Sequence, residues 1–294
     1  MKRHKVYITD CDHGYIDPEI EVLQTIGVTP ILRNCKTEQA VIEQCGDADA
    51  LLIQRVRIGK KVFASLSDLK VICRYGVGYD NFDVPEATRA GVMAVNVPDY
   101  CIDEVSNHAL AMLLAWCRYI PSYNYAVHNG GWDHHSEPPL ERLAGKTVGI
   151  VGFGRIGSEL GRKVKALGVE VIVYDPYVDE LPPGFKKVGF DQLFSQSDYI
   201  SLHCPLNRET FHLVGQKALN LMKPTAVLIN TARGSIVDQR SLSAALKEGK
   251  IRGAALDVLE TEPPAADEEL LGLDNVYLSP HAAYYSEESQ VELK

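Results

Sequence analysis

The sequence predicts an α/β fold made of two Rossmann-like, doubly wound parallel-sheet domains with a cleft between them. Two observations support this prediction: short apolar runs alternate with helical patterns along nearly the whole chain, and a unit of strand, glycine turn, helix and strand occupies residues 147–175. At 294 residues, the chain is also long enough to form two separate cores.

The first 98 residues alternate in the way expected of a small parallel sheet with its own helices. The predicted strands are the apolar runs 6–9, 29–32, 50–53, 71–73 and 92–94. The predicted helices are 18–26, 38–45, 60–66 and 85–90. None of the connecting turns is a phosphate-binding loop.

Two loops of this first domain are candidate ligand sites. Arg55 and Arg57 follow a predicted strand end, where open α/β sheets present ligand-binding loops, and residues 74–81 (RYGVGYDN) form a loop with two glycines. Backbone amides of this loop could hold a substrate carboxylate, namely those around Gly76, Val77 and Gly78. The alternatives are that both arginines are solvated surface charges and that the glycines form a plain turn.

Residues 98–104 are predicted to cross between the domains and to lead into a long helix. Asp103 and Glu104 lie in its first turn, as the helix dipole prefers. Its apolar face is predicted to consist of Val105, Ala109, Met112, Leu113, Trp116 and Ile120. We expect this face to be buried at the domain junction or against a second subunit. His134 and His135 follow in a polar loop without a cluster of further ligands, so no metal site is predicted.

The segment TVGIVGFGRIGSELGRKVKALGVEVIVYD is the one place where turn chemistry, periodicity and charge agree. Gly152 allows a sharp turn, Gly154 allows the backbone to approach a pyrophosphate, and Gly157 allows the helix to pack closely on the strand. The helix is predicted to end at Gly168 and to bury one face, which consists of Leu160, Val164 and Leu167.

A dinucleotide would lie on this glycine turn. The backbone amides of Arg155, Ile156 and Gly157 would face its phosphates from the positive end of the helix. Asp175, 18 residues beyond Gly157, is placed to accept hydrogen bonds from the adenosine ribose. Because a carboxylate there would repel a 2′-phosphate, the sequence predicts NAD rather than NADP. The alternative is a glycine-rich turn in an unrelated α/β domain.

Further strands are predicted at 199–202, 226–229, 253–256 and 276–278, with a helix at 241–248. Together with the glycine unit they form a parallel sheet in which ligands lie beyond the carboxyl ends of the strands. The residues predicted to contact the cofactor at those ends are His203, Pro205, Thr231, Ala232 and Asp257, the last through the nicotinamide carboxamide.

Three further side chains near the same strand ends suit hydride transfer to a keto acid. Arg233 could pair two-to-two with a substrate carboxylate. His281 could serve as the acid or base, because imidazole titrates near neutral pH. Glu262 would tune that acid and fix the orientation of its ring. Taken singly, each could instead be a surface ion pair or a satisfied core group.

Composition limits the classes of function. A net charge of -9 argues against non-specific binding to nucleic acid or to an anionic membrane. Seven scattered cysteines without a CxxC pair suit a reducing compartment. The start, MKRHKVYITD, lacks a signal-peptide apolar region, and the most apolar window, 109–117, is too short to span a bilayer. We therefore expect a cytoplasmic protein with no direct nucleic-acid partner and no membrane partner.

Six motifs together resemble the D-isomer-specific 2-hydroxyacid dehydrogenase family: RYGVGYDN, GFGRIG, HCPLNRET, INTARGSIVD, ALDVLETEP and SPHAAYYSE. The resemblance implies two α/β domains around a cleft, NAD in one of them, a catalytic triad of Arg233, Glu262 and His281, and a homodimer formed through the cofactor domain. It also implies that the last segment returns to the first domain. The expected domains are then a flavodoxin-like substrate-binding domain, residues 1–98 plus 283–294, and an NAD-binding domain, residues 99–282.

Within the family, DEVSNHALAMLL and HAAYYSEESQ resemble the phosphoglycerate dehydrogenase-like branch, which also contains the carboxy-terminal-binding-protein corepressors. Two features depart from the family pattern. Relatives usually carry a further helix after the position of Lys294, and Val105 stands where relatives often have a hydroxyl near the nicotinamide.

These features lead to one main functional prediction, an NAD-dependent oxidoreductase acting on a D-2-hydroxyacid or its 2-keto acid, with 3-phosphoglycerate among the candidate substrates. The alternative is a dimeric, NAD(H)-sensing scaffold like the corepressors, with little catalysis. A third reading, oxidation of formate or phosphite, is disfavoured by Glu262-Pro263, because the formate enzymes carry an amide at that position.

Overall fold

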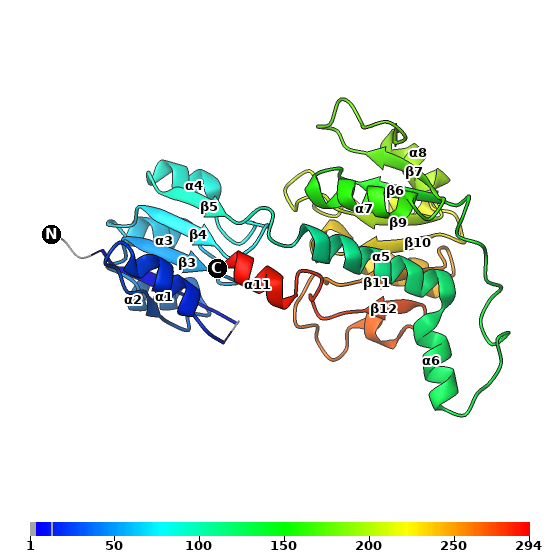
Figure 1. Cartoon of the computed structure of the whole chain (residues 1–294), viewed down its shortest axis with the longest axis horizontal. Coiled ribbons are helices and arrows are strands. Elements are labelled where there is room, and N and C mark those ends of the chain that lie inside the picture. The colour runs from blue at the N-terminus through cyan, green and yellow to red at the C-terminus, as the bar shows by residue number, and fades with distance from the viewer. Residues whose placement is uncertain (1–3, 13) are drawn as a thin grey trace. The chain divides into compact units, whose positions relative to one another are not determined.

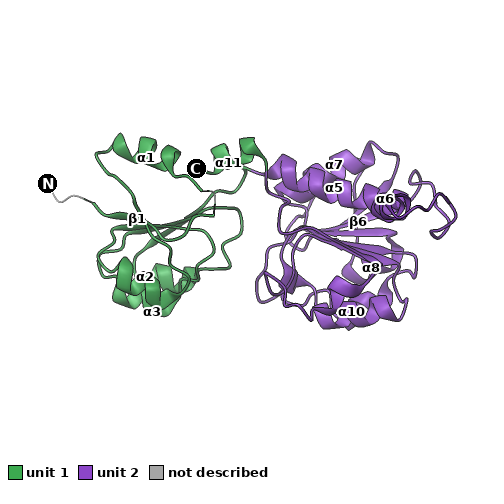
Figure 2. Ribbon diagram, turned by 90° about the horizontal axis from the view of Figure 1, so that it is seen from below, with its two compact units in different colours: residues 1–100, 286–294 green, residues 101–285 purple. Residues whose placement is uncertain are grey.

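The computed structural model describes residues 4–12 and 14–294 and divides the chain into two compact units. Unit 1 comprises the described residues up to Tyr100 together with Ser286–Lys294, and unit 2 comprises Cys101–Tyr285 (Figure 2). Each unit is a parallel β-sheet with helices on both faces. The predicted fold class of two doubly wound parallel α/β domains is therefore confirmed.

Unit 1 is built on a five-stranded sheet with the strand order β2-β1-β3-β4-β5 (Figure 1). Its strands are β1 (Val6–Ile8), β2 (Ile31–Leu32), β3 (Ala50–Ile53), β4 (Val71–Arg74) and β5 (Met93–Asn96). Its helices are α1 (Asp17–Gln24), α2 (Glu38–Gln44), α3 (Lys60–Ser65), α4 (Val84–Arg89) and α11 (Glu287–Leu293). Helices α1 and α11 lie on one face of the sheet and α2 and α3 on the other (Figure 2). Because both faces are covered, central strand residues such as Leu51, Ile53 and Ile72 are fully buried.

The last helix attaches the end of the chain to unit 1. The Ser286 hydroxyl accepts a hydrogen bond from the amide of Ser289, and the Ser289 hydroxyl accepts one from the amide of Ser286, which closes a capping box at the start of α11. At its other end, Nζ of Lys294 lies 3.7 Å from Oε1 of the buried Glu19. Glu19 in turn accepts a 2.7 Å hydrogen bond from the hydroxyl of Tyr75. The segment Ser286–Lys294 is thus fixed to α1 and to the loop after β4.

Unit 2 is built on a seven-stranded sheet with the order β12-β11-β10-β9-β6-β7-β8. Its strands are β6 (Thr147–Val151), β7 (Glu170–Tyr174), β8 (Lys186–Lys187), β9 (Tyr199–Leu202), β10 (Val227–Asn230), β11 (Gly253–Leu256) and β12 (Val276–Leu278). Its helices are α5 (Ile102–Arg118), α6 (Ile120–His128), α7 (Arg155–Lys165), α8 (Phe190–Gln196), α9 (Gln216–Leu221) and α10 (Gln239–Lys247), with 3-10 turns at Gly234–Ile236 and Glu269–Gly272. The strand order reverses between β6 and β9, and ligands of doubly wound sheets lie at such a reversal.

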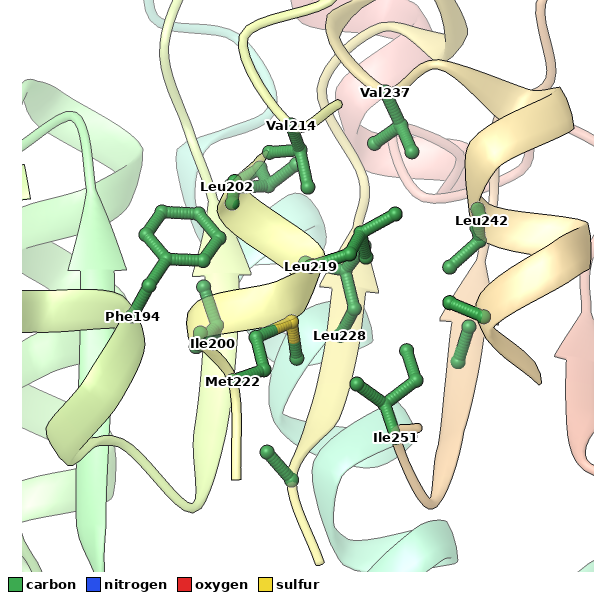
Figure 3. Close-up of a cluster of buried hydrophobic side chains, with 14 of the residues drawn as sticks. Phe194, Ile200, Leu202, Val214, Leu219, Met222, Leu228, Val237, Leu242 and Ile251 are labelled. Carbon is green, nitrogen blue, oxygen red and sulfur yellow. The ribbon is translucent and has the colours of Figure 1, made fainter. Parts of the chain in front are cut away.

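Side chains alternate between two apolar layers on either face of this sheet. On β10, Leu228 belongs to the layer beneath α8, α9 and α10, whereas Val227 and Ile229 belong to the layer beneath α5 and α7. Figure 3 shows part of the first layer, including Phe194 from α8, Leu219 from α9 and Leu228 from β10. Close packing of these two layers holds the strands in place. The residues that follow the carboxyl ends of the strands therefore have fixed positions.

Two predicted core positions are wrong, because each helix ends before reaching them. Helix α5 ends at Arg118, and Tyr119 takes a left-handed conformation (φ 49°), so Ile120 begins α6 and is 59% exposed. Helix α7 ends at Lys165, which leaves Leu167 38% exposed. The other residues of both predicted faces are buried. Most of those of α5 pack on the sheet of unit 2 itself, and not at the domain junction or against a second subunit as expected.

Candidate cofactor and catalytic site

The glycine turn after β6 depends on close backbone packing at two of its three glycines. Gly152 has φ 88°, and a Cβ on it would lie 2.8 Å from the backbone of His203. A Cβ on Gly157 would lie 2.1 Å from the carbonyl oxygen of Gly152. Around Gly154, by contrast, a Cβ would meet nothing within 4 Å. Gly152 and Gly157 therefore allow the turn to pack against the segment after β9 and against α7. Gly154 leaves the outer side of the turn open.

Helix α7 begins directly at this turn. Gly154 is its N-cap and has no side chain to accept a hydrogen bond from the amides of the first turn. The predicted phosphate-facing amides belong to that turn, at Arg155, Ile156 and Gly157. Such an uncapped helix N-terminus after a glycine turn suits an anion, because its amide hydrogens and its dipole both favour negative charge.

Asp175 follows β7 and is hydrogen-bonded to the glycine turn itself. Its Oδ2 accepts from the amide of Phe153 and its Oδ1 from the amide of Tyr177, each at 2.8 Å. A carboxylate oxygen can accept two hydrogen bonds, so both oxygens retain capacity for ribose hydroxyls. The negative charge at this position also disfavours a 2′-phosphate, which fits NAD.

The segment after β9 carries His203, Cys204 and Pro205. Nε2 of His203 lies 2.8 Å from the Ser201 hydroxyl, and burial lowers the pKa of His203 to about 4. Burial likewise raises the pKa of the Cys204 thiol to about 11. Both side chains are therefore neutral at neutral pH and add no charge beside the glycine turn.

Asn230 shapes the turn after β10. Its side chain is buried, accepts from the amide of Ala232 at 3.0 Å and donates to the carbonyl of Arg233 at 2.9 Å. The sequence prediction did not include Asn230, although an Asn at a strand end is a known turn former. The neighbouring Thr231 is buried, and its hydroxyl has no hydrogen-bond partner among the described residues. A bound cofactor could supply that partner, because buried hydroxyls are nearly always hydrogen-bonded.

Gly234 brings the Arg233 turn against the segment that carries Glu262. A Cβ on Gly234 would lie 2.0 Å from the carbonyl group of Leu259 and 2.4 Å from the amide nitrogen of Glu260. Arg233 itself donates from Nη1 to the carbonyl of Ala232 at 2.8 Å. Since Glu262 follows three residues after Leu259 and accepts a hydrogen bond from its amide at 2.9 Å, the two loops are held side by side.

Glu262 and His281, two of the predicted catalytic residues, are in direct contact. Oε2 of Glu262 lies 2.5 Å from Nδ1 of His281. Burial raises the pKa of Glu262, but the hydrogen bond and charge of His281, the Leu259 amide and the charge of Arg233 outweigh burial and hold the pKa below its usual 4.5. The carboxylate is therefore ionised at neutral pH and holds Nδ1 of the His281 imidazole, which leaves Nε2 for the predicted proton transfer.

Asp257 lies at the end of β11 and fixes the turn that contains His281. Its buried carboxylate accepts from the hydroxyl of Ser279 and from the amides of Ala282 and Ala283, at 2.5 to 2.9 Å. The predicted contact with the nicotinamide carboxamide remains a prediction, because these bonds already use three of the acceptor sites on the carboxylate.

The candidate substrate residues lie in unit 1. Nε of Arg55 lies 2.6 Å from Oδ2 of Asp12, and the Arg55 side chain is more than half exposed. Gly76 has φ 129°, and a Cβ on it would overlap the guanidinium of Arg74. The carbonyl of Val77 accepts from the Asn96 side chain at 2.7 Å.

The two candidate loops of unit 1 are joined to each other. Asn81, which ends the RYGVGYDN motif, donates from its side chain to the carbonyls of Gln54 and Val56 at 3.2 and 3.1 Å. These bonds join the segment that contains Arg55 to the end of the RYGVGYDN loop.

Among the described residues, His, Cys, Asp and Glu side chains do not gather in any group of three or more that could hold a metal ion. None of the helices in residues 4–12 and 14–294 combines the length and the apolar character that a bilayer crossing requires.

A parallel doubly wound sheet, a glycine turn leading into a helix N-terminus and an acid at the end of the next strand define a dinucleotide-binding protein. The family profile described as D-isomer specific 2-hydroxyacid dehydrogenase, NAD binding domain, matches residues 110–283. The chain belongs to this family, as its motifs predicted, and unit 2 contains the NAD-binding domain. NAD is therefore its cofactor, as expected from Asp175.

Individual proteins show the same relationship. The chain is 38% identical to the D-3-phosphoglycerate dehydrogenase of Methanocaldococcus jannaschii over 97% of this chain and 54% of that protein. It is 42% identical to the glyoxylate reductase of Thermococcus litoralis over 86% of this chain and 80% of that protein. The solved structure of D-lactate dehydrogenase from Aquifex aeolicus with NAD and lactic acid superposes with a TM-score of 0.89, at 28% identity, covering 98% of this chain and 92% of the other. The chain thus spans only about half the length of the phosphoglycerate dehydrogenase.

Proposed function

We propose that this chain is an NAD-dependent oxidoreductase that transfers a hydride between nicotinamide and a D-2-hydroxyacid or its 2-keto acid. The observation that carries the proposal is the 2.5 Å contact between Glu262 and His281 beside the Arg233 turn. An ionised carboxylate, an imidazole and a guanidinium are the groups that reversible protonation of a keto-acid oxygen requires.

Each of the three side chains has a separate role in this proposal. Arg233 pairs with the substrate carboxylate and orients the keto carbon. His281 gives a proton from Nε2 to the oxygen as the keto group is reduced, and takes it back in the reverse direction. Glu262 holds the imidazole by Nδ1. Bound NADH would supply the hydride for reduction of the keto acid, and bound NAD+ would accept it in the reverse reaction.

The cofactor contacts follow from the strand ends of unit 2. Gly152, Gly154, Gly157 and the first-turn amides of α7 would hold the pyrophosphate, and Asp175 the adenosine ribose. The buried hydroxyl of Thr231, which has no hydrogen-bond partner in the described part of the chain, supports a cofactor contact at the turn after β10. The remaining proposed cofactor contacts are His203, Pro205, Ala232 and Asp257.

We propose that residues 1–98 plus 283–294 bind the substrate and that residues 99–282 bind the cofactor. Amides of the Gly76–Gly78 loop would bind the substrate together with Arg55. The likeness to glyoxylate reductases and to phosphoglycerate dehydrogenases supports a small 2-keto acid, with or without a phosphate. A phosphorylated substrate would need further cations, which Arg57 or Arg74 could supply.

The direct test is NADH oxidation with a panel of glyoxylate, pyruvate and 3-phosphohydroxypyruvate. We expect turnover of at least one of them, and a loss of about 10²–10⁴ in kcat for His281→Ala, because general acid–base roles usually contribute that much. The control is His4→Ala, whose ring is exposed in unit 1. NADH binding without turnover of any keto acid would contradict the proposal and favour the NAD(H)-sensing scaffold.

The proposal also includes a homodimer formed through the NAD-binding domain and a cytoplasmic location. Large apolar side chains are exposed on and after α6, where Ile120, Tyr125, Val127 and Trp132 face solvent, which favours a protein partner there.

The proposed cytoplasmic location is supported by the cysteines. All seven are free, as a reducing compartment favours. Recovery of the protein with a secreted fraction of its source cells would contradict the location.

A further inference from the structure

A side chain of α5 is hydrogen-bonded to the turn that carries His281. Nε2 of His108 lies 2.9 Å from the hydroxyl of Ser279 and 3.6 Å from Oδ1 of Asp257. The Ser279 hydroxyl lies 2.5 Å from the same carboxylate oxygen, to which it donates its single proton. The Ser279 oxygen can therefore only accept from His108, so Nε2 of His108 carries the hydrogen.

This arrangement brackets His281 from both sides. Before it, Ser279 is held by His108 and Asp257. After it, the amides of Ala282 and Ala283 donate to the two oxygens of Asp257 at 2.8 and 2.9 Å. The amide of His281 itself donates to the backbone carbonyl of Asp257 at 2.8 Å. The buried carboxylate of Asp257 thus accepts three hydrogen bonds, and its backbone carbonyl accepts a fourth, from residues 279–283 around the proposed acid.

His281 needs such support because its backbone is in a region that residues with a side chain rarely occupy. Its φ is 53°, in the left-handed region. A non-glycine residue keeps this conformation only where its surroundings fix it by several interactions. The bonds to Asp257 and Ser279 are those interactions, and the ring can then meet Glu262 at 2.5 Å.

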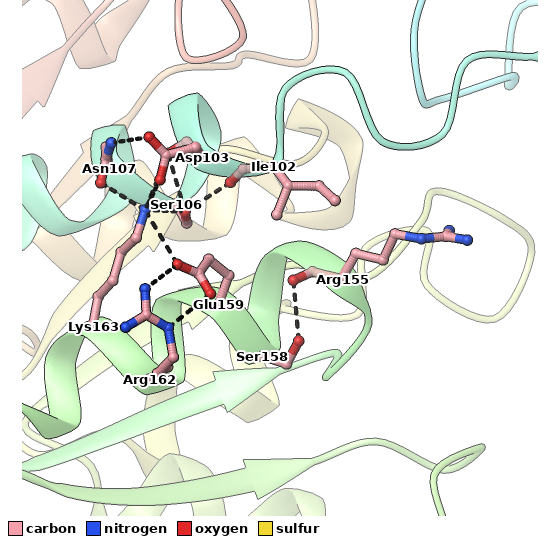
Figure 4. A network of polar contacts seen from close by, with 9 residues as sticks. All are labelled: Ile102, Asp103, Ser106, Asn107, Arg155, Ser158, Glu159, Arg162 and Lys163. Carbon is pink, nitrogen blue, oxygen red and sulfur yellow. Dashed lines mark hydrogen bonds and ion pairs between the residues drawn. The ribbon is translucent and has the colours of Figure 1, made fainter.

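The helix that supplies His108 is itself anchored near the glycine turn. Lys163 of α7 donates to the side chains of Asp103, Ser106 and Asn107 at 2.6 to 2.8 Å, and these residues form the turns of α5 directly before His108 (Figure 4). The Lys163 side chain is only 12% exposed, so this contact is partly shielded from water. The position of His108 is therefore set relative to the helix that begins at the cofactor turn.

We propose that His108 is a positioning residue for His281, acting through Ser279 and Asp257. The inference rests on the proposed catalytic role of His281. His108 makes no contact with the reacting atoms in this scheme; its ring donor keeps the Ser279 hydroxyl directed at Asp257, which holds the 279–283 turn in the geometry that points the His281 ring at Glu262.

The test compares His108→Leu, which removes the donor, with His108→Gln, which keeps an N–H donor. His4→Leu is the matched control, because His4 is exposed in unit 1. Hydrogen exchange of the Ala282 and Ala283 amides, followed by NMR, needs no substrate. We expect exchange to be at least about tenfold faster in His108→Leu, because the hydrogen-bonded turn opens more often, and close to the parent in His108→Gln.

The second readout is kinetic. In His108→Leu, kcat for the keto acid should fall by about 10- to 100-fold with the KM for NADH nearly unchanged, because a displaced catalytic group costs rate rather than cofactor affinity. His108→Gln should restore most of the rate. The Ser279→Ala variant removes the same link from its other end, and the double variant His108→Leu/Ser279→Ala should be no worse than either single one, since the two residues act in series.

The inference is overturned if His108→Leu leaves the exchange of the Ala282 and Ala283 amides at the parent rate. It is also overturned if His108→Gln and His108→Leu lower kcat equally, or if the kcat losses of His108→Leu and Ser279→Ala multiply in the double variant. If His108→Leu does not fold, the exchange and kinetic comparison of His108→Gln with Ser279→Ala decides in its place. A parent protein that turns over no keto acid refutes the proposed function, while the exchange experiment still tests whether His108 holds the turn.

Discussion

A few side chains at the candidate site are charged, and the titratable side chains His203 and Cys204 near them are neutral. Glu262 is ionised because His281 and Arg233 lower its pKa more than burial raises it. His203 and Cys204 are neutral, because burial lowers the pKa of His203 and, together with the nearby charge of Asp175, raises the pKa of Cys204. The charges that remain are therefore those that a carboxylate substrate and a proton transfer would use.

The neutral state of His203 predicts how stability changes with pH. Its pKa is about 4 in the folded chain and near 6.5 in the unfolded chain. As the pH falls from 6.5 toward 4, the unfolded chain takes up a proton that the folded chain does not, so the free energy of unfolding decreases. A shift of this size corresponds to roughly 3 kcal/mol, at about 1.4 kcal/mol per pKa unit.

The measurement is urea unfolding at several pH values for the parent and for His203→Gln, which can still bond to Ser201 but cannot titrate. We expect the parent to lose stability more steeply between pH 6.5 and 4 than His203→Gln. The control His4→Gln removes an exposed imidazole and should follow the parent. If the free energy of unfolding falls with pH equally in the parent and in His203→Gln, then folding does not lower the pKa of His203.

At the scale of elements, the site is assembled from turns whose backbone atoms pack directly against the backbone of neighbouring segments. Gly157 fits α7 against the turn after β6, and Gly234 fits the Arg233 turn against the segment before Glu262. The second contact matters more for the proposed chemistry, because it joins the turn of Arg233 to the segment of Glu262, and both residues have proposed catalytic roles. A side chain at Gly234 should therefore disturb both stability and catalysis.

Gly234→Ala tests this expectation. The new methyl group would meet the Leu259 carbonyl at 2.0 Å, and both contact partners are backbone atoms that cannot turn away. We expect the free energy of unfolding to fall by about 1–3 kcal/mol, as for other overpacked sites, together with a reduced kcat. Urea unfolding and the NADH assay measure the two effects.

The matched control for this variant is Gly272→Ala. Gly272 also lies at a 3-10 turn of unit 2, but a Cβ there would meet nothing within 4 Å. Its stability and activity should therefore stay near those of the parent. A Gly234→Ala protein as stable and active as Gly272→Ala would mean that the two loops are not held together by this contact.

At the scale of the whole molecule, the strands and the family could be predicted, and contacts between distant elements could not. Periodicity located all five strands of unit 1 to within a few residues, because buried parallel strands are short apolar runs. It failed at Tyr119, because no glycine marks that left-handed residue and the apolar period runs on into α6. The contact between His108 and Ser279 joins residues 171 positions apart, and only the packing of α5 on the sheet brings them together.

The proposed homodimer is a prediction about the assembled protein. Tyr125 is 72% exposed and Trp132 is 89% exposed, and so much exposed aromatic surface favours contact with another copy of the NAD-binding domain. Light scattering after size-exclusion chromatography should give twice the chain mass of 32.5 kDa. Tyr125→Asp and Trp132→Asp should each shift the mass toward that of one chain, because a charge would have to be buried without a partner.

Ile26→Asp is the control for this experiment, because Ile26 is 70% exposed, nearly as much as Tyr125, but lies in unit 1 just after α1. It should leave the dimer intact. A parent that elutes with the mass of one chain would refute the dimer. A dimer that both aspartate variants leave intact but Ile26→Asp dissociates would move the interface to unit 1, and the exposed aromatic residues near α6 would then need a different partner.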